Sequence, residues 1–148
     1  MHLTRPTMFL AIAISLSACA DATGPKVVTG RFTLSDINGR SLPTYQAATP
    51  GLTAMIIHAD LELDDAGHAT WIEDRLQFDG TPVTYTTNYT YEIRGAEVEF
   101  ETQPCPPNAI CAGPPHGTMS PITGDLDVEI GRFESLPIIY HFRRLALP

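Results

Sequence analysis

Histidines and acidic side chains are the residues of this sequence that could bind a metal or transfer protons. Outside the N-terminus the histidines lie on four separate segments, at His58, His68, His116 and His141. No two of them share a strand at ligand spacing. One strand face carries alternating carboxylates, at Asp125, Asp127 and Glu129. Such a face could bind calcium, but a solvated acidic face is far commoner, so the sequence predicts no metal site.

The sequence lacks the motifs of the common enzyme classes and the charge of a nucleic-acid-binding protein. It has no Gly-x-Ser-x-Gly elbow, phosphate loop or dinucleotide fingerprint, so we expect neither an enzyme nor a cofactor. A hydrolase would require a nucleophile and a histidine within about 3 Å. Lys and Arg total 9 against 17 for Asp and Glu, and the basic residues are scattered. An acidic surface repels phosphates, which excludes nucleic acid as a partner.

The first 18 residues have the pattern of a secretory signal. His2 and Arg5 precede a run of nine apolar or small residues, Met8 to Leu16. A membrane-spanning helix needs about 20 residues, so this run is too short to cross a bilayer. A basic start, a short apolar run and small residues before the processing point predict a signal helix that is removed. The alternative is a buried N-terminal helix.

Residues 16–19, Leu-Ser-Ala-Cys, resemble the lipobox of bacterial lipoproteins in all four positions. The resemblance implies that Cys19 becomes the mature N-terminus and carries a lipid that anchors the protein to a membrane. Ala20 stands where an inner-membrane lipoprotein usually has Asp, which favours the outer membrane of the cell envelope. Residues 19–27 are then a tether, and residues 28–148 form the folded domain. The alternative is a plain secreted protein in which Cys19 is incidental.

Cys105 and Cys111 are separated by five residues in a proline-rich stretch. An exported protein folds in an oxidising compartment, so we interpret this pair as a disulfide. Closing so small a loop would stabilise the fold by roughly 2 kcal/mol. A metal site at this position is the weaker alternative, because His116 is the only further ligand nearby.

Short strands joined by turns account for the rest of the chain. Thirteen prolines and eleven glycines leave little room for helices. Apolar and polar residues alternate with period two in several segments, which predicts half-buried strands. These segments are 28–35, 55–64, 85–93, 125–130 and 138–142, the last with Ile138, Tyr140 and Phe142 on one face. In 55–64 the alternation places Met55, Ile57, Ala59, Leu61 and Leu63 together.

The turns suggest how the strands align. Asn38-Gly39 is a strong hairpin signal. Residues 64–67, Asp-Asp-Ala-Gly, suit a three-residue hairpin loop that would set Leu61 opposite Trp71 and turn Trp71 toward the core. Arg94-Gly95 fits a two-residue turn that would set Tyr91 opposite Val98.

About eight strands in consecutive antiparallel order predict an all-β, up-and-down barrel. Closing the sheet removes exposed edges and leaves an interior that side chains fill or that holds one small ligand. A β-sandwich is the alternative architecture.

The domain resembles the small lipocalin-like β-barrel domains of bacterial lipoproteins. Gly30-Arg31-Phe32 stands where lipocalins have Gly-x-Trp on the first strand. Arg143 or Arg144 on the last strand matches the arginine that packs across that aromatic ring. A second resemblance, to the META domain of bacterial surface lipoproteins, rests on residues 34–39. The lipocalin resemblance implies a barrel whose lumen could bind a small apolar ligand.

Four inward side chains are the candidates for lining such a lumen: Trp71, Arg75, Tyr89 and Tyr91. Tyrosine and tryptophan combine apolar area with a polar group, as in many small-molecule pockets. Arg75 with Glu73 is expected to form an ion pair at the surface or rim. The simpler alternative is that the aromatic rings only fill the core.

Two functions remain open. The first is an envelope lipoprotein that binds a small apolar ligand in the barrel. The second is a structural or protein-interaction lipoprotein with a solid core and no ligand. An interior filled by large side chains would exclude the first, and the side chains in question are Phe32, Leu61, Trp71, Tyr91 and Phe142.

Overall fold

The computed structural model describes residues 28–45, 54–102, 113–131 and 137–146. These ranges form strands and turns, and they include no helix long and apolar enough to cross a membrane. The strands are β1 (Gly30–Ile37), β2 (Arg40–Ser41), β3 (Thr44–Tyr45), β4 (Met55–Leu63), β5 (His68–Leu76), β6 (Pro82–Arg94), β7 (Glu97–Glu101), β8 (His116–Met119), β9 (Leu126–Ile130) and β10 (Ile138–Arg144). The predicted signal, tether and disulfide, with Cys19, Cys105 and Cys111, lie outside the described residues.

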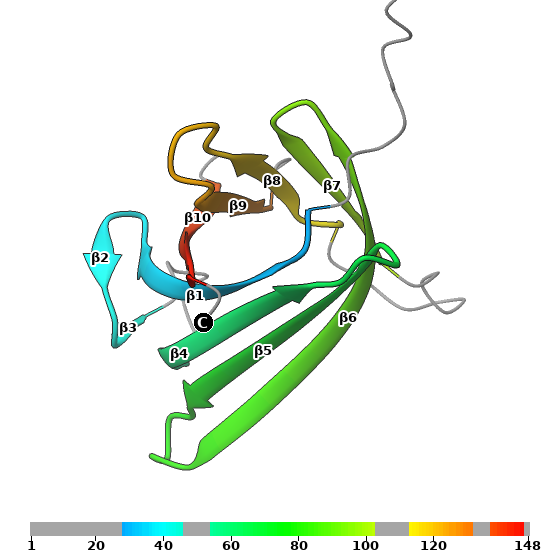
Figure 1. Cartoon of the computed structure of the whole chain (residues 1–148). Helices are drawn as coiled ribbons and strands as arrows, with labels where there is room; N and C mark the ends of the chain where they lie inside the picture. Colours follow the sequence, from blue (N-terminus) through cyan, green and yellow to red (C-terminus); the bar gives the residue numbers. More distant parts are fainter. Residues whose placement is uncertain (1–27, 46–53, 103–112, 132–136, 147–148) are drawn as a thin grey trace, which may run out of the picture.

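The sheet closes on itself as an eight-stranded antiparallel barrel (Figure 1). From β4 to β10 each strand pairs with the next in sequence, and β1 pairs with β10 on one side and with β4 on the other. The short strands β2 and β3 extend the edges of β1 and β4. This confirms the predicted all-β, up-and-down, lipocalin-like barrel in place of a sandwich.

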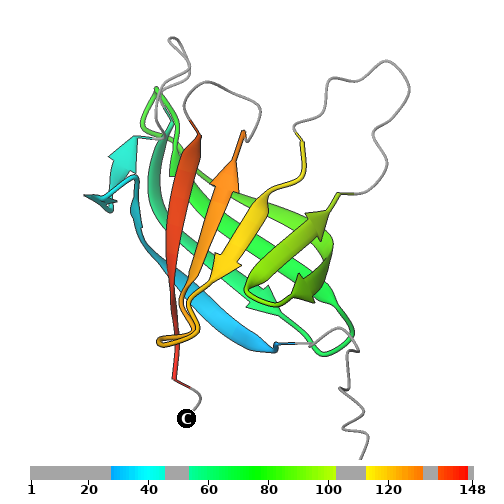
Figure 2. The same cartoon turned by 90° about the horizontal axis from the view of Figure 1, so that it is seen from above.

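The barrel has two distinct ends, which lie toward the bottom and the top of Figure 2 and are called the lower and upper ends. The lower end contains the start of β1, the β4–β5 and β6–β7 turns and the end of β10. The upper end contains the β1–β2 and β5–β6 turns and the start of β10. The chain therefore enters and leaves the barrel at the lower end.

The β4–β5 hairpin confirms one predicted register and corrects one predicted face. Leu61 lies opposite Trp71, as expected. A register shift between Ile56 and His58 changes the pattern at the start of β4. Ile56 is fully buried there and Ile57 is 41% exposed, so the predicted inward position of Ile57 is wrong. A bulge inserts one unpaired residue, which reverses the alternation on one side of it.

The β6–β7 hairpin turns one residue later than the sequence suggested. Tyr91 pairs with Phe100 and not with Val98, because Gly95 and Ala96 form the two-residue turn. Gly95 has a φ of 68°, and a glycine at the first central position suits a type II′ turn. The error is a slip of two residues, which leaves every side chain on its predicted face.

Aromatic rings fill the centre of the barrel. The Trp71 ring lies edge-on to Tyr140 and Phe142, with centroid separations of 5.2 and 5.0 Å. Aromatic side chains bury about 150–250 Å² each, so they dominate a core of this size. At the lower end the Tyr91 hydroxyl donates to the carbonyl oxygen of Asp64 at 2.7 Å.

Gly117 on β8 faces the core at a position with no room for a side chain. A Cβ at this position would lie 3.0 Å from Val98 Cβ and 3.2 Å from Phe100 Cε2. Both neighbours are buried, so neither has free space into which to move.

Replacing Gly117 with valine should therefore overpack the core. We expect the free energy of unfolding to fall by about 1–3 kcal/mol in a urea titration. The control is Thr118→Val, since Thr118 is the exposed neighbour on the same strand, and it should change stability by less than about 0.5 kcal/mol. Equal losses in the two variants would show that β8 does not pack as described.

Candidate functional site

The lower and central parts of the barrel are solid. The five side chains whose burial would exclude a lumen ligand are all in the core, with exposures of 0 to 6%: Phe32, Leu61, Trp71, Tyr91 and Phe142. They form one continuous cluster of buried residues. An extended apolar ligand has no space along the barrel axis.

A small cavity of about 80 Å³ remains above Trp71, toward the upper end. The inward-facing positions of β5 and β6 form most of its wall, and β9 contributes one residue. Its lining is Trp71, Glu73, Arg75, Tyr85, Thr87, Tyr89 and Ile130. Three of the four predicted ligand-lining residues thus meet at one site. The fourth, Tyr91, does not, because its hydroxyl is bonded at the lower end.

Glu73 and Arg75 form an ion pair inside this pocket. The Nε of Arg75 donates to Oε1 of Glu73, and the guanidinium lies 5.0 Å from the centroid of the Tyr85 ring. The expected pair is present and lies toward the rim, with the Arg75 side chain 29% exposed, but Glu73 is deeper than a surface position because it is only 3% exposed. Sequence alternation put Glu73 on the inner face and could not show how deep it lies.

The environment of Glu73 works against its charge. Burial raises the pKa of this carboxyl above its ordinary value, while the charge and hydrogen bond of Arg75 and a hydrogen bond from Trp71 lower it. Arg75 is therefore the main group that keeps a carboxylate tolerable in the core.

Tyr140 is a polar residue of this region that sequence reasoning did not select. Its side chain is fully buried, and its hydroxyl has no hydrogen-bond partner among the described residues. Burial and the negative charge of Glu73 raise its pKa, which keeps the hydroxyl protonated. A buried hydroxyl without a hydrogen-bond partner lowers the stability of a fold by about 1–3 kcal/mol, so the Tyr140 hydroxyl is an energetic cost within this core. The only sequence signal was a tyrosine at an inward strand position.

A larger hollow of about 590 Å³ lies against the outer side of β5, β6 and the end of β7. Exposed polar side chains make up most of its lining, including His68, Asn88, Thr90 and Glu101. The smaller cavity is the better candidate site, because a buried carboxylate, an arginine and aromatic rings converge there.

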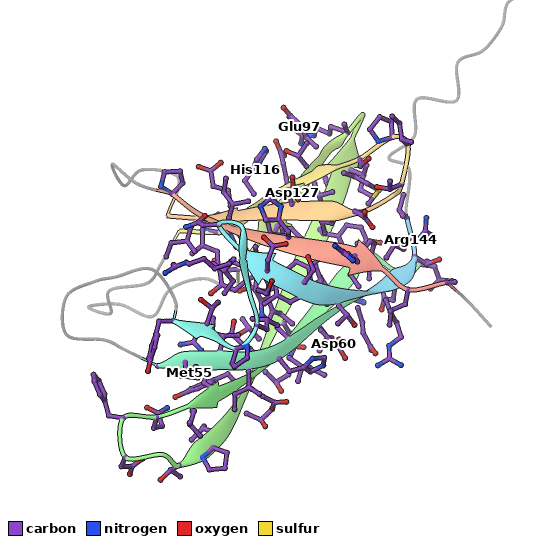
Figure 3. All side chains as sticks on the ribbon, turned by 90° about the vertical axis from the view of Figure 1, so that its left-hand side faces the viewer. Met55, Asp60, Glu97, His116, Asp127 and Arg144 are labelled. Carbon is purple, nitrogen blue, oxygen red and sulfur yellow. The ribbon has the colours of Figure 1, made fainter. Side chains whose placement is uncertain are left out.

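Among the described residues, His58 and His68 each pair with one carboxylate and His141 lies between two, Asp36 and Asp127, but the histidines do not gather into a site. His141 Nδ1 lies 2.6 Å from Asp127, on the outer face of β9 and β10. Figure 3 labels Asp127 on β9 and His116 on the neighbouring β8. Across the described ranges, no three His, Cys, Asp or Glu side chains are arranged to bind a metal.

Removing the charge of Arg75 should destabilise the fold in a pH-dependent way. In Arg75→Met the apolar stem remains, but Glu73 loses its partner and its folded-state pKa rises further. We expect the free energy of unfolding to fall by about 1–3 kcal/mol near pH 7. This is less than the ~3–5 kcal/mol typical when a fully buried ion pair is broken, because the Arg75 side chain is 29% exposed. Urea titrations at several pH values measure it.

The direction of this pH dependence follows from proton linkage. The folded protein holds the Glu73 proton more tightly than the unfolded chain, whose carboxyl has a pKa near 4.5. The loss should therefore be small below that pH and grow as pH rises through the folded-state pKa. Arg94→Met, which removes the exposed ion pairs of Arg94 with Glu92 and Glu99, is the control and should change the free energy of unfolding little. A loss in Arg75→Met that is the same at all pH values would contradict this account.

The lower end places the lipocalin-like residues beside each other. Arg144, labelled at that end of the barrel in Figure 3, lies opposite Phe32, while Arg143 lies opposite Thr33. A Cβ on Gly30 would be 3.4 Å from both Arg144 Nε and the Phe32 ring. Arg144 is thus the arginine next to the aromatic ring. Comparison with protein-family models, with curated proteins and with solved structures found no match to this chain.

Proposed function

We propose that this chain is a cell-envelope lipoprotein whose barrel acts as a solid-cored interaction module. The single observation that carries this choice is the filled interior, since Phe32, Leu61 and Phe142 are at most 1% exposed. A protein that carried an apolar ligand would need an open lumen. Recognition is then a property of the outer surface and the upper end.

The anchor in this proposal is a lipid on Cys19, in the outer membrane in preference to the inner. The described barrel begins with Val28 at the lower end. The nine residues 19–27 precede Val28, and even fully extended they span only about 30 Å. The lower end then lies toward the membrane, and the upper pocket faces away from it. The proposed Cys105–Cys111 disulfide belongs to the same exported state.

A second candidate function is binding of a small group in the upper pocket. It is favoured by the convergence of Trp71, Arg75 and Tyr89 on one cavity. The volume of about 80 Å³ is well below the ~150 Å³ of an apolar cavity known to hold benzene. The ligand would therefore be smaller than the apolar molecules that lipocalin-like barrels enclose, or would insert only one group.

Lipid attachment can be tested by growing cells with a fatty-acid analogue that carries a chemical tag. We expect label on the wild-type protein and none on Cys19→Ala, because the thiol is the attachment site. Cys105→Ala is the matched control and should keep its label. Mass spectrometry of the protein extracted from envelopes should also find Cys105 and Cys111 bridged. An unlabelled wild-type protein would rule out the anchor.

The filled lumen can be tested by fluorescence, because Trp71 is the only tryptophan. Oleate should produce no saturable change in Trp71 emission, since the long chain has no space beside the ring. Phe142→Leu opens space next to Trp71 and should increase any change in Trp71 emission on adding oleate. Its loss in free energy of unfolding should be less than the ~3–5 kcal/mol typical of Phe→Ala. Saturable one-to-one binding by the wild-type protein would instead restore the apolar-ligand function.

A further inference from the structure

Strand β6 has a long edge that no other described strand covers. Residues 82–90 pair with β5 on one side. On the other side β7 reaches only as far as Thr90, which lies opposite Glu101. In Figure 1 this part of β6 runs along the outer side of the β4–β5–β6 sheet, away from β7. Within the described ranges, the edge from Pro82 to Tyr89 has no partner strand.

The backbone groups on this edge can be assigned from the ladder. The N–H of Tyr91 donates to the carbonyl of Gly67, on the β5 side, at 2.8 Å. Backbone groups of successive residues point to opposite sides of a strand. Odd-numbered residues of β6 therefore bond toward β5. The even-numbered residues Thr84, Thr86 and Asn88 present their N–H and C=O groups to the open edge.

The edge also differs from the rest of the surface in charge. The chain has 17 acidic and 9 basic residues, but residues 82–89, Pro-Val-Thr-Tyr-Thr-Thr-Asn-Tyr, include none of either. Natural sheets usually block an exposed edge with charged side chains or proline. Here only Pro82 does so, at the end of the segment. The Tyr85 side chain remains 43% exposed.

We propose that this edge pairs with the same edge of a second copy of the chain. An antiparallel pairing centred on Thr86 sets Thr86 of the two copies opposite each other, and the flanking pairs are Thr84 with Asn88, Tyr85 with Thr87 and Val83 with Tyr89. Each pair is uncharged, and pairs of aromatic with β-branched residues stabilise sheets. Two copies, each with a formal net charge of −8, meet along segments that contain no charged residue. The neighbouring carboxylate of Asp74 lies one strand behind the edge and accepts a hydrogen bond from Thr84 at 2.6 Å, and acidic groups more than about 8 Å apart are screened.

Cross-linking of the full-length protein in envelopes tests the geometry. Cα atoms of directly opposed residues in an antiparallel pair are about 4.5–5.5 Å apart, within the range that a disulfide spans. Thr86→Cys should therefore give a covalent dimer on a non-reducing gel. Thr118→Cys, an exposed position on β8, is the control. Equal cross-linking at both positions, or none at Thr86→Cys, would overturn the proposal.

Sedimentation of the detergent-extracted protein tests the energetics. The wild-type protein should form a dimer, and Thr86→Lys should weaken it by at least about tenfold, because two like charges meet at the twofold axis. Circular dichroism should show that the variant keeps its fold, since Thr86 is exposed and its side chain points outward. A wild-type monomer, or a dimer that Thr86→Lys leaves unchanged, would refute pairing through β6.

Discussion

The pairing of β1 with β4 is the interaction on which the rest of the barrel depends. It joins the first strand to the second long strand and converts an open sheet into a closed one. Phe32 lies opposite Leu61 across this seam, and both are fully buried. On the outer face Thr33 donates to Asp60 at 2.7 Å, and Arg31 pairs with Glu62. The β1–β4 pairing ends at Thr33, and just beyond it the register of β1 against β10 shifts between Leu34 and Asp36, so the seam is confined to the lower half. The seam thus lies beside the lower part of the core, and Ile37 and Ile56 continue the buried core beyond it.

The upper half of the barrel differs from the lower half in strand pairing and in its inward side chains. There β4, β5 and β6 continue without a described partner beyond β6, and the inward side chains of β5 become polar, from Trp71 to Glu73 and Arg75. The small cavity lies at the level where β6 has no described partner strand on one side. A buried carboxylate is tolerated at this level because the arginine beside it lies close enough to water to keep its own charge solvated.

Sequence periodicity was sufficient for the fold class, the barrel order and most of the core, because alternation directly reports which face a side chain occupies. Periodicity was not sufficient at Ile57, where a bulge reverses the alternation. It was also not sufficient at the β6–β7 turn, because a turn at Arg94-Gly95 and the observed turn at Gly95-Ala96 place the same side chains inward. Trp71, Arg75 and Tyr89, which were selected as residues that could line a ligand site, do lie around one cavity, whereas Tyr91 does not. The depth of Glu73 and the unpartnered hydroxyl of Tyr140 were not predicted, since both depend on distances across the barrel that no local pattern encodes.

The point where the chain enters the barrel is held on two sides. The Tyr91 hydroxyl, whose proton goes mainly to Asp64 at 2.7 Å, shares it with the carbonyl oxygen of Val28 at 3.2 Å, and Arg144 Nη2 donates to the carbonyl oxygen of Thr29. If a lipid anchor pulls on the domain, the load arrives at these residues before it reaches any strand. Tyr91 passes it to β6 and Arg144 to β10, on opposite sides of the barrel. These two contacts thus spread a mechanical force over two distant strands. A force applied to β1 alone would instead break its hydrogen bonds to the neighbouring strands one at a time.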